Sequence, residues 1–209
     1  MSFARFPLVH LSRGRLEEYP TEAPAPALQG LAKRAEMAYV VDLQGLTRNK
    51  ADLDIVREAS RKAALWVDGG SRYATDVMDL FIAGAERVTV RWNTLHSYSE
   101  LIEASDLSEE VYLGVEFQNG FVDNRRDPAG SVDHLFRSVQ QLGVGLVLID
   151  LAGGAGPQIN PQLAHLGARY QGRKWYMGGS GDAFDRETLD SLAYSGLLVP
   201  ARAMPEASS

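Results

Sequence analysis

The chain has 209 residues, 45% of them hydrophobic, a formal net charge of −6 and no cysteine. This length can bury a sizeable core, and we expect one domain over residues 1–209. The lack of cysteine excludes disulfides, thiolate metal sites and a cysteine nucleophile. Acidic and basic residues are interspersed without a basic block, which argues against nucleic acid as a partner. No apolar run marks a signal peptide or approaches the roughly 18 residues of a membrane span, so we expect a cytoplasmic protein without membrane contact.

Short apolar runs rich in β-branched residues alternate with longer amphipathic segments. The runs predict eight strands, at 6–11, 38–43, 64–69, 87–92, 111–117, 145–151, 174–179 and 195–200. Apolar residues spaced by three and four predict helices, several of which end in glycine, at 50–63, 74–85, 131–143 and 185–196. This alternation predicts parallel βαβ units and an α/β fold closed as a (β/α)8, or TIM, barrel. We expect the proline-rich segment 19–28 to be a loop, and the chain after Pro200 to be too short for a full eighth helix.

An internal repeat divides the predicted barrel into two halves. The sequence WVDGGS at 66–71 returns as WYMGGS at 175–180, an offset of 109 residues. VHLSRGRL returns as VEFQNGFV at an offset of 106, and YVVDLQG matches LVLIDLAGG at an offset of 108. Because each match falls at the carboxyl end of a predicted strand, we expect a doubled half-barrel, with halves of about 1–106 and 107–209.

The carboxyl ends of the strands are where the active sites of such barrels lie. His10 ends the first predicted strand and Glu116 the fifth, so the repeat places them on opposite sides of the mouth. Two titratable groups that face each other can serve as general acid and general base on one substrate. The alternative for His10 is a hydrogen-bonded histidine without a catalytic role. Asp42 and Asp150 end the second and sixth strands, where a carboxylate either takes part in catalysis or caps a loop.

Two Gly-Gly-Ser turns follow the third and seventh predicted strands. Consecutive glycines let backbone N–H groups approach an anion, and the N-terminus of the next helix adds a favourable field. The predicted phosphate-binding residues are Gly69, Gly70, Ser71, Gly178, Gly179 and Ser180. Two such sites imply a substrate with an anion at each end. The same glycines are needed for the turn geometry whether or not an anion binds.

The motifs, in their order along the chain, resemble those of the histidine-biosynthesis barrel family. PLVHLSRGRL is similar to the first strand of that family, AYVVDLQG to the second, VDGGSR and IAGAERV to the third and fourth, and the stretch from GGS to ARAM to the last phosphate site. The resemblance extends from Phe6 to Met204. It implies phosphorylated substrates and, for the isomerase of the family, an Amadori rearrangement with its acid and base at the positions of His10 and Glu116.

The chain departs from the family at these positions. The family has aspartate where this chain has His10 and Glu116, and Gly-Thr where this chain has Arg91 followed by tryptophan. Arg91 either fills the first phosphate pocket or binds the phosphate or carboxylate of a different substrate. Arg202 either binds the substrate or braces the barrel, and Asp68 is expected to cap the next helix. Core packing is expected for the tryptophans, Trp66, Trp92 and Trp175.

We expect a diverged enzyme of this kind, with isomerase-type acid/base chemistry on a phosphorylated or anionic small metabolite. The alternatives are the histidine-pathway isomerase itself and a non-catalytic barrel that binds a metabolite or a partner protein. The chain also resembles isomerase-related barrels of methanogens and methylotrophs, which implies methanopterin-linked one-carbon cofactor metabolism. No zinc-ligand spacing, P-loop or dinucleotide fingerprint occurs, so we expect neither a metal nor a cofactor. The sequence leaves open whether the chain forms a homo-oligomer.

Overall fold

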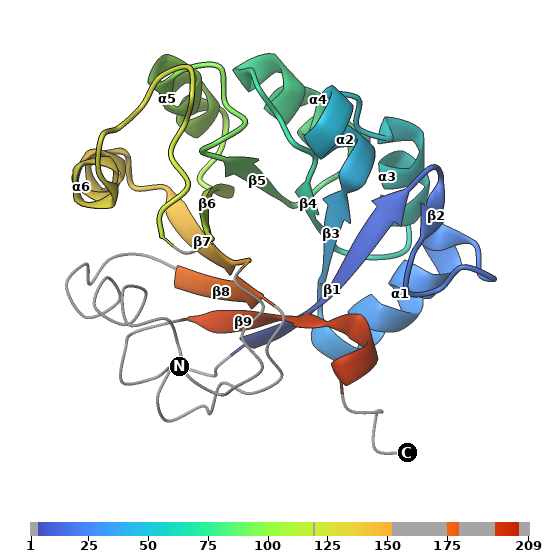
Figure 1. The fold of residues 1–209 in the computed structure, drawn as a ribbon. Coiled ribbons are helices and arrows are strands. Elements are labelled where there is room, and N and C mark those ends of the chain that lie inside the picture. Colours follow the sequence, from blue (N-terminus) through green and yellow to red (C-terminus); the bar gives the residue numbers. More distant parts are fainter. Residues whose placement is uncertain (1–3, 119, 152–174, 180–194, 205–209) are drawn as a thin grey trace.

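The computed structural model describes residues 4–118, 120–151, 175–179 and 195–204, and within them eight parallel strands close into a barrel (Figure 1). Around the barrel these are β1 (Ala4–Ser12), β3 (Ala38–Asp42), β4 (Leu65–Asp68), β5 (Arg87–Arg91), β6 (Val111–Phe117), β7 (Gly145–Asp150), β8 (Trp175–Gly179) and β9 (Gly196–Pro200). Each strand pairs with the next, and β9 pairs with β1, which closes the sheet. All eight predicted strands and the α/β barrel are confirmed.

Helices cover the outside of the described barrel (Figure 1). They are α1 (Pro24–Ala35), α2 (Leu43–Arg48), α3 (Leu53–Ser60), α4 (Ala74–Ala83), α5 (Tyr98–Leu107) and α6 (Val132–Leu142). Three of the predicted helices are confirmed as α3, α4 and α6, and α4 and α6 end at glycines with positive φ, Gly84 and Gly143. The fourth, at 185–196, lies outside the described residues up to residue 194. After β9 the described chain ends with a 3-10 turn, Ala201–Ala203, and Met204.

The proline-rich segment 19–28 is not a loop throughout, as the sequence predicted, because α1 begins within it at Pro24. Pro24 and Pro26 occupy the first turn of the helix, where backbone N–H groups have no partner within the helix in any case. Leu28 and Leu31 are buried and hold the inner face of the helix against the sheet. Proline therefore starts this helix instead of excluding it.

Two apolar layers are separated by the alternation of side chains along the strands. One layer lies between the sheet and the helices and includes Val40, Val67 and Val88. The other fills the barrel interior with Phe6, Met37, Tyr39, Val41, Trp66, Tyr112, Val147, Ile149 and Leu198. Because consecutive side chains of a strand point to opposite sides, these interior residues show which strand-end side chains face the mouth.

Trp66 is fully buried in the barrel interior. Its ring centroid lies 5.6 Å from that of Phe6, 5.1 Å from that of Tyr39 and 4.5 Å from that of Tyr112. The guanidinium of Arg87, at the start of β5, lies 5.4 Å from the Trp66 ring centroid, within cation–π range. Core packing is confirmed for Trp66 and for the equally buried Trp92; the side chain of Trp175 lies outside the described part of the chain.

Candidate active site

Four polar side chains at the carboxyl ends of the strands face the barrel interior. His10 on β1, Asp68 on β4, Arg91 on β5 and Glu116 on β6 each lie two or four residues beyond a side chain that packs in the interior. Alternate residues of a strand share a side, so these four point the same way. They gather at the end of the barrel where enzymes of this fold have their active sites.

His10 is paired with Glu18. Glu18 Oε1 lies 2.6 Å from His10 Nδ1, and Glu18 Oε2 accepts a hydrogen bond from the His10 backbone N–H at 2.9 Å. The side chain of Glu18 is 13% exposed and that of His10 is 38% exposed. Burial raises the pKa of the Glu18 carboxyl, but the hydrogen bonds with His10 outweigh burial, and the pKa lies below its ordinary value. Because the carboxylate contacts Nδ1, it orients the imidazole ring.

A hairpin after β1 places Glu18 beside His10. Arg13 and Gly14 both have positive φ, 51° and 77°, and form the tight turn to β2 (Arg15–Leu16), which pairs antiparallel with β1. From the other end of the chain, Arg202 Nη2 donates to the backbone carbonyl of Glu18 at 3.3 Å. Arg202 thus has the bracing contact that was one of its two predicted roles, made through a backbone oxygen.

Arg91 binds two carboxylates at the end of β5. Its Nε donates to Asp68 Oδ2 at 2.6 Å, and its Nη1 forms an ion pair with Glu116 Oε1. Glu116 Oε2 accepts a further hydrogen bond from Asn93 Nδ2 at 2.7 Å. Arg91 and Glu116 are each 8% exposed and Asp68 is fully buried. This enclosure favours the interpretation in which Arg91 fills the predicted phosphate pocket over the one in which it binds a substrate.

Asp68 is not the cap of the next helix, as the sequence predicted. Its Oδ2 accepts hydrogen bonds from Arg91 and from the Tyr39 hydroxyl, the latter at 3.3 Å, whereas Asp76 caps the start of α4. Burial raises the pKa of the Asp68 carboxyl, and the Arg91 charge opposes this rise only in part. Burial, and then the Asp68 charge, raise the pKa of Tyr39. The pKa of Asp68 is thus raised, whereas that of Glu18, beside His10, is lowered.

Asp42 and Asp150 occupy matching positions in the two half-barrels, and both follow an interior residue directly. Val41 and Ile149, the residues before them, belong to the interior cluster. Because consecutive side chains alternate, the Cα–Cβ bonds of the two aspartates are directed to the outer side of the sheet. Both carboxylate oxygens of Asp42 accept hydrogen bonds from backbone N–H groups, three in all, at 2.9, 2.9 and 2.7 Å. Asp42 therefore caps α2, one of its two predicted roles. The catalytic role of Asp150 stays a prediction.

Packing alone requires a glycine at position 70 of the first Gly-Gly-Ser turn. Gly70 has a φ of 66°, and a Cβ there would lie 2.4 Å from the backbone nitrogen of Leu46. A Cβ on Gly45 would lie 2.0 Å from the carbonyl oxygen of Gly69. The turn and α2 therefore approach each other more closely than any side chain would allow. This contact explains Gly70 without an anion.

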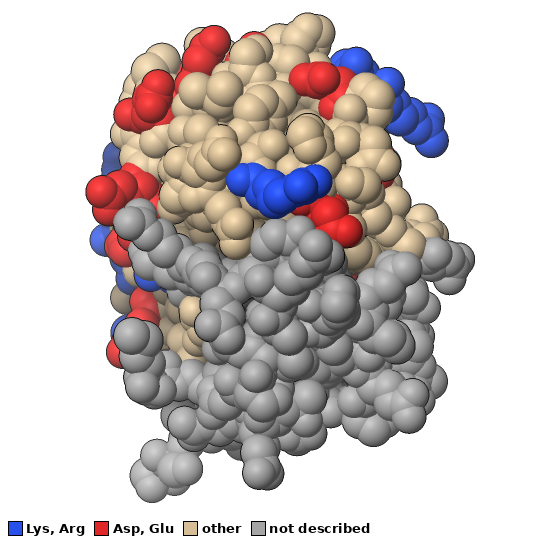
Figure 2. All heavy atoms as spheres, turned by 90° about the vertical axis from the view of Figure 1, so that its left-hand side faces the viewer, with Lys and Arg blue, Asp and Glu red and all other residues tan. Residues whose placement is uncertain are grey.

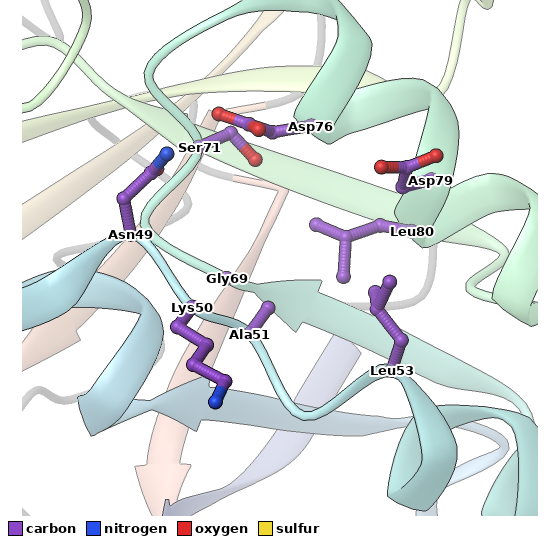
Figure 3. A pocket seen from close by; sticks show the side chains of 9 residues that line it. All are labelled: Asn49, Lys50, Ala51, Leu53, Gly69, Ser71, Asp76, Asp79 and Leu80. Carbon is purple, nitrogen blue, oxygen red and sulfur yellow. The ribbon is translucent and has the colours of Figure 1, made fainter.

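A hollow of about 220 Å³ lies beside this turn (Figure 3). The buried Ser71 Oγ, which has no hydrogen-bond partner among the described residues, and Lys50 line it together with the carboxylates of Asp76 and Asp79. At the start of α4, Asp76 and Glu100 already accept hydrogen bonds from three successive backbone N–H groups, at 2.8, 3.1 and 2.9 Å. The chain's own carboxylates thus occupy the helix N-terminus, and phosphate binding at this turn stays a prediction.

The second Gly-Gly-Ser turn is described only in part. Gly178 and Gly179 end β8 in register with Ile149 and Asp150 of β7, and Ser180 lies outside the described residues. Phosphate binding there also stays a prediction.

Within the described ranges, no group of three or more His, Asp or Glu side chains could hold a metal ion. None of the helices in those ranges has the length and apolar character needed to cross a membrane. Figure 2 shows one face of the molecule, on which the lysine and arginine side chains are scattered among acidic and uncharged ones. The residues described on that face form no continuous basic surface.

Sequence reasoning missed two residues of this site, Glu18 and Asn93. The Arg-Gly turn and the short β2 that bring Glu18 back to His10 leave a local signal, because a tight turn between a strand-end histidine and a carboxylate eight residues later predicts a hairpin contact. Asn93 reaches Glu116 from the loop after β5, and its contact depends on side-chain directions on two separate strands. No pattern in the sequence reports that contact.

The fold and the polar strand ends define a (β/α)8 barrel with a candidate active site at its carboxyl mouth. The family model described as histidine biosynthesis protein matches residues 8–204. The chain therefore belongs to the histidine biosynthesis protein family. No curated protein matches the chain. Because the family match spans both half-barrels, His10, Arg91 and Glu116 all lie within it.

Proposed function

We propose that the chain is an enzyme of this family in which His10 transfers a proton to or from an anionic small metabolite at the barrel mouth. The observation that carries the proposal is the contact between His10 Nδ1 and Glu18 Oε1, 2.6 Å long, on an inward-facing and half-exposed side chain. A carboxylate in this position orients the imidazole for acid/base work at Nε2. A histidine that served packing alone would have no need of access to the mouth.

Glu116 has a different role in this proposal. Its carboxylate is 8% exposed, and both of its oxygens already have partners, Oε1 in the ion pair with Arg91 and Oε2 in the hydrogen bond from Asn93. We therefore assign both proton transfers of an isomerisation to His10, which takes a proton from one substrate atom and returns it to a neighbouring one. The Arg91 and Glu116 charges stay fixed and act on the polarised substrate electrostatically.

The family membership also supports a second function, the histidine-pathway isomerase itself, since the family model covers residues 8–204. The buried Arg91, in the place of Gly-Thr, favours a different substrate. A role in methanopterin-linked one-carbon metabolism rests on resemblance alone. Expression in a histidine auxotroph separates these functions: growth without histidine supports the isomerase, and its absence supports a diverged substrate.

The test of the proposal is His10→Asn in the organism of origin, with His96→Asn as the matched control. His96 is exposed, and its ring packs against that of Tyr73. Loss of general acid/base catalysis is expected to lower the rate about 10²- to 10⁴-fold, which His10→Asn should show as loss of the growth phenotype with a melting temperature lowered by only about 2–4 °C. Full growth of the His10→Asn strain would establish the alternative, a barrel that binds without catalysis.

A further inference from the structure

A second hollow of about 220 Å³ lies at the rim of the mouth, among the loops that follow β4, β5 and β6. Its lining residues are Arg72, Asn93, Thr94, Asn124, Arg125 and Arg126. Three of the six are arginines and none is acidic, in a chain whose formal net charge is −6. The local charge of this hollow is therefore opposite to that of the whole chain.

The three arginines lack carboxylate partners within the described part of the chain. Arg72, Arg125 and Arg126 take part in none of the ion pairs found there, although the nearby Arg91 takes part in two. Arg126 Nη1 donates to the backbone carbonyl of Thr94 at 3.4 Å, a long hydrogen bond to a neutral acceptor. Their positive charges are thus not neutralised by that part of the chain.

The acidic residues of the same loop bind other donors. Asp123 accepts hydrogen bonds from the Trp92 indole Nε1 at 2.7 Å and from three backbone N–H groups of its own loop. Burial raises the pKa of the Asp123 carboxyl, but these hydrogen bonds outweigh burial and hold the pKa below its ordinary value. Asp127 accepts from the Tyr98 backbone N–H at 2.7 Å. Neither carboxylate lines the hollow.

A buried asparagine fixes the loop that carries two of the arginines. Asn124 is 2% exposed; its Nδ2 donates to the carbonyls of Trp92 and Leu95, at 2.8 and 2.9 Å, and its Oδ1 accepts from the Arg126 N–H at 2.8 Å. A loop held in this way loses little conformational entropy when it binds a ligand. Asn93, on the opposite wall, binds Glu116 and so joins the hollow to the mouth.

We propose that this hollow binds a compact oxyanion, the phosphate or carboxylate group of a small molecule that docks at the mouth. Guanidinium groups bind both kinds of oxyanion in a bidentate manner. The hydrogen-bond donors of this hollow are side chains from three loops. They differ in this from the backbone N–H donors predicted for the Gly-Gly-Ser turns. The inference goes beyond the proposed function, because the site exists whether or not His10 transfers a proton.

The test is calorimetric titration of the full chain with three probes: inorganic phosphate, ribose 5-phosphate and citrate. The variant Arg125→Gln/Arg126→Gln is compared with Arg34→Gln/Arg61→Gln, which removes two exposed arginines from the opposite end of the barrel, at the ends of α1 and α3. Loss of charge-assisted hydrogen bonds should weaken binding about 10- to 100-fold in the first variant, and the second should bind like the wild type. Arg72→Gln should weaken binding in the same direction.

The probes identify the group that binds. Binding of both phosphate compounds assigns a phosphate site, whereas binding of citrate alone assigns a carboxylate site. Equal affinity of the two double variants, or no binding of any probe by the wild type up to about 10 mM, would overturn the proposal. Growth of the His10→Asn strain and probe binding by the arginine variants are separate readouts, so a failure of the proposed catalysis and a failure of this site give different results. Melting curves without ligand check that each variant is folded.

Discussion

The two sides of the mouth use charged groups in opposite ways. On the β1 side, the half-exposed His10 meets one carboxylate, whose pKa is lowered. On the β4–β6 side, the buried Arg91 meets two carboxylates, and burial raises the pKa of one of them, Asp68. His10 and Glu116 hold matching positions in the sequence repeat, yet His10 is half-exposed and Glu116 is buried in an ion pair. Matching positions in the predicted repeat therefore differ in exposure and in charge partners.

Removal of the buried charge of Arg91 should have the largest effect on the free energy of unfolding. Arg91→Met removes the guanidinium and leaves Asp68 and Glu116 as buried, uncompensated carboxylates. Loss of one partner of a buried ion pair costs about 3–5 kcal/mol, and urea unfolding should show a loss of this size. Arg57→Met, which breaks an exposed pair with Asp54, should cost less than about 0.5 kcal/mol.

The triple variant Asp68→Asn/Arg91→Met/Glu116→Gln removes the buried charges together and should recover much of the stability lost in Arg91→Met. If Arg91→Met lost less than about 1 kcal/mol, the Arg91 cluster would not be the rigid element that we describe.

The turns beside the two sides differ in how tightly they pack, and alanine substitution should reveal this difference. Gly14 in the hairpin has a φ of 77° and open space around its Cβ position, whereas Gly70 has a φ of 66° and backbone within 2.4 Å. Gly14→Ala should cost about 1–2 kcal/mol for the left-handed conformation alone. Gly70→Ala should cost about 1–3 kcal/mol more because of overpacking, as measured by thermal unfolding. Equal losses would mean that the contact with α2 relaxes freely.

Glu18→Gln should have the smallest effect on stability, about 1 kcal/mol at pH 7, because His10 is partly exposed. The folded pKa of Glu18 lies below the unfolded value of about 4.3, so the ionised carboxylate stabilises the fold above that pH. This contribution is lost as the pH falls through the folded pKa. The difference in unfolding free energy between the wild type and Glu18→Gln should therefore shrink from pH 7 to about pH 3. Glu22→Gln, at an exposed position of the same segment, should show no such change.

The eight strands could be predicted from the sequence because each is a short apolar run between helical segments. The sides that their end residues face were harder to predict. All five residues of β3 are buried, since helices cover one side of the strand and the interior lies on the other, so the apolar pattern does not show that Asp42 points away from His10. The fate of Arg91 could not be predicted either, because its partners Asp68 and Glu116 come from two other strands whose registers only the closed barrel defines.

The ring cluster around Trp66 makes the mouth a blind end, since the aromatic side chains fill the interior beneath the polar strand ends. A reactant and its product then use the same opening of the site and cannot occupy it together. The product has to leave before the next reactant enters, so the proposed enzyme should be slowed by its own product through simple competition for space. Evolution of a larger substrate would have to proceed outward, through the loops, and not downward into the barrel.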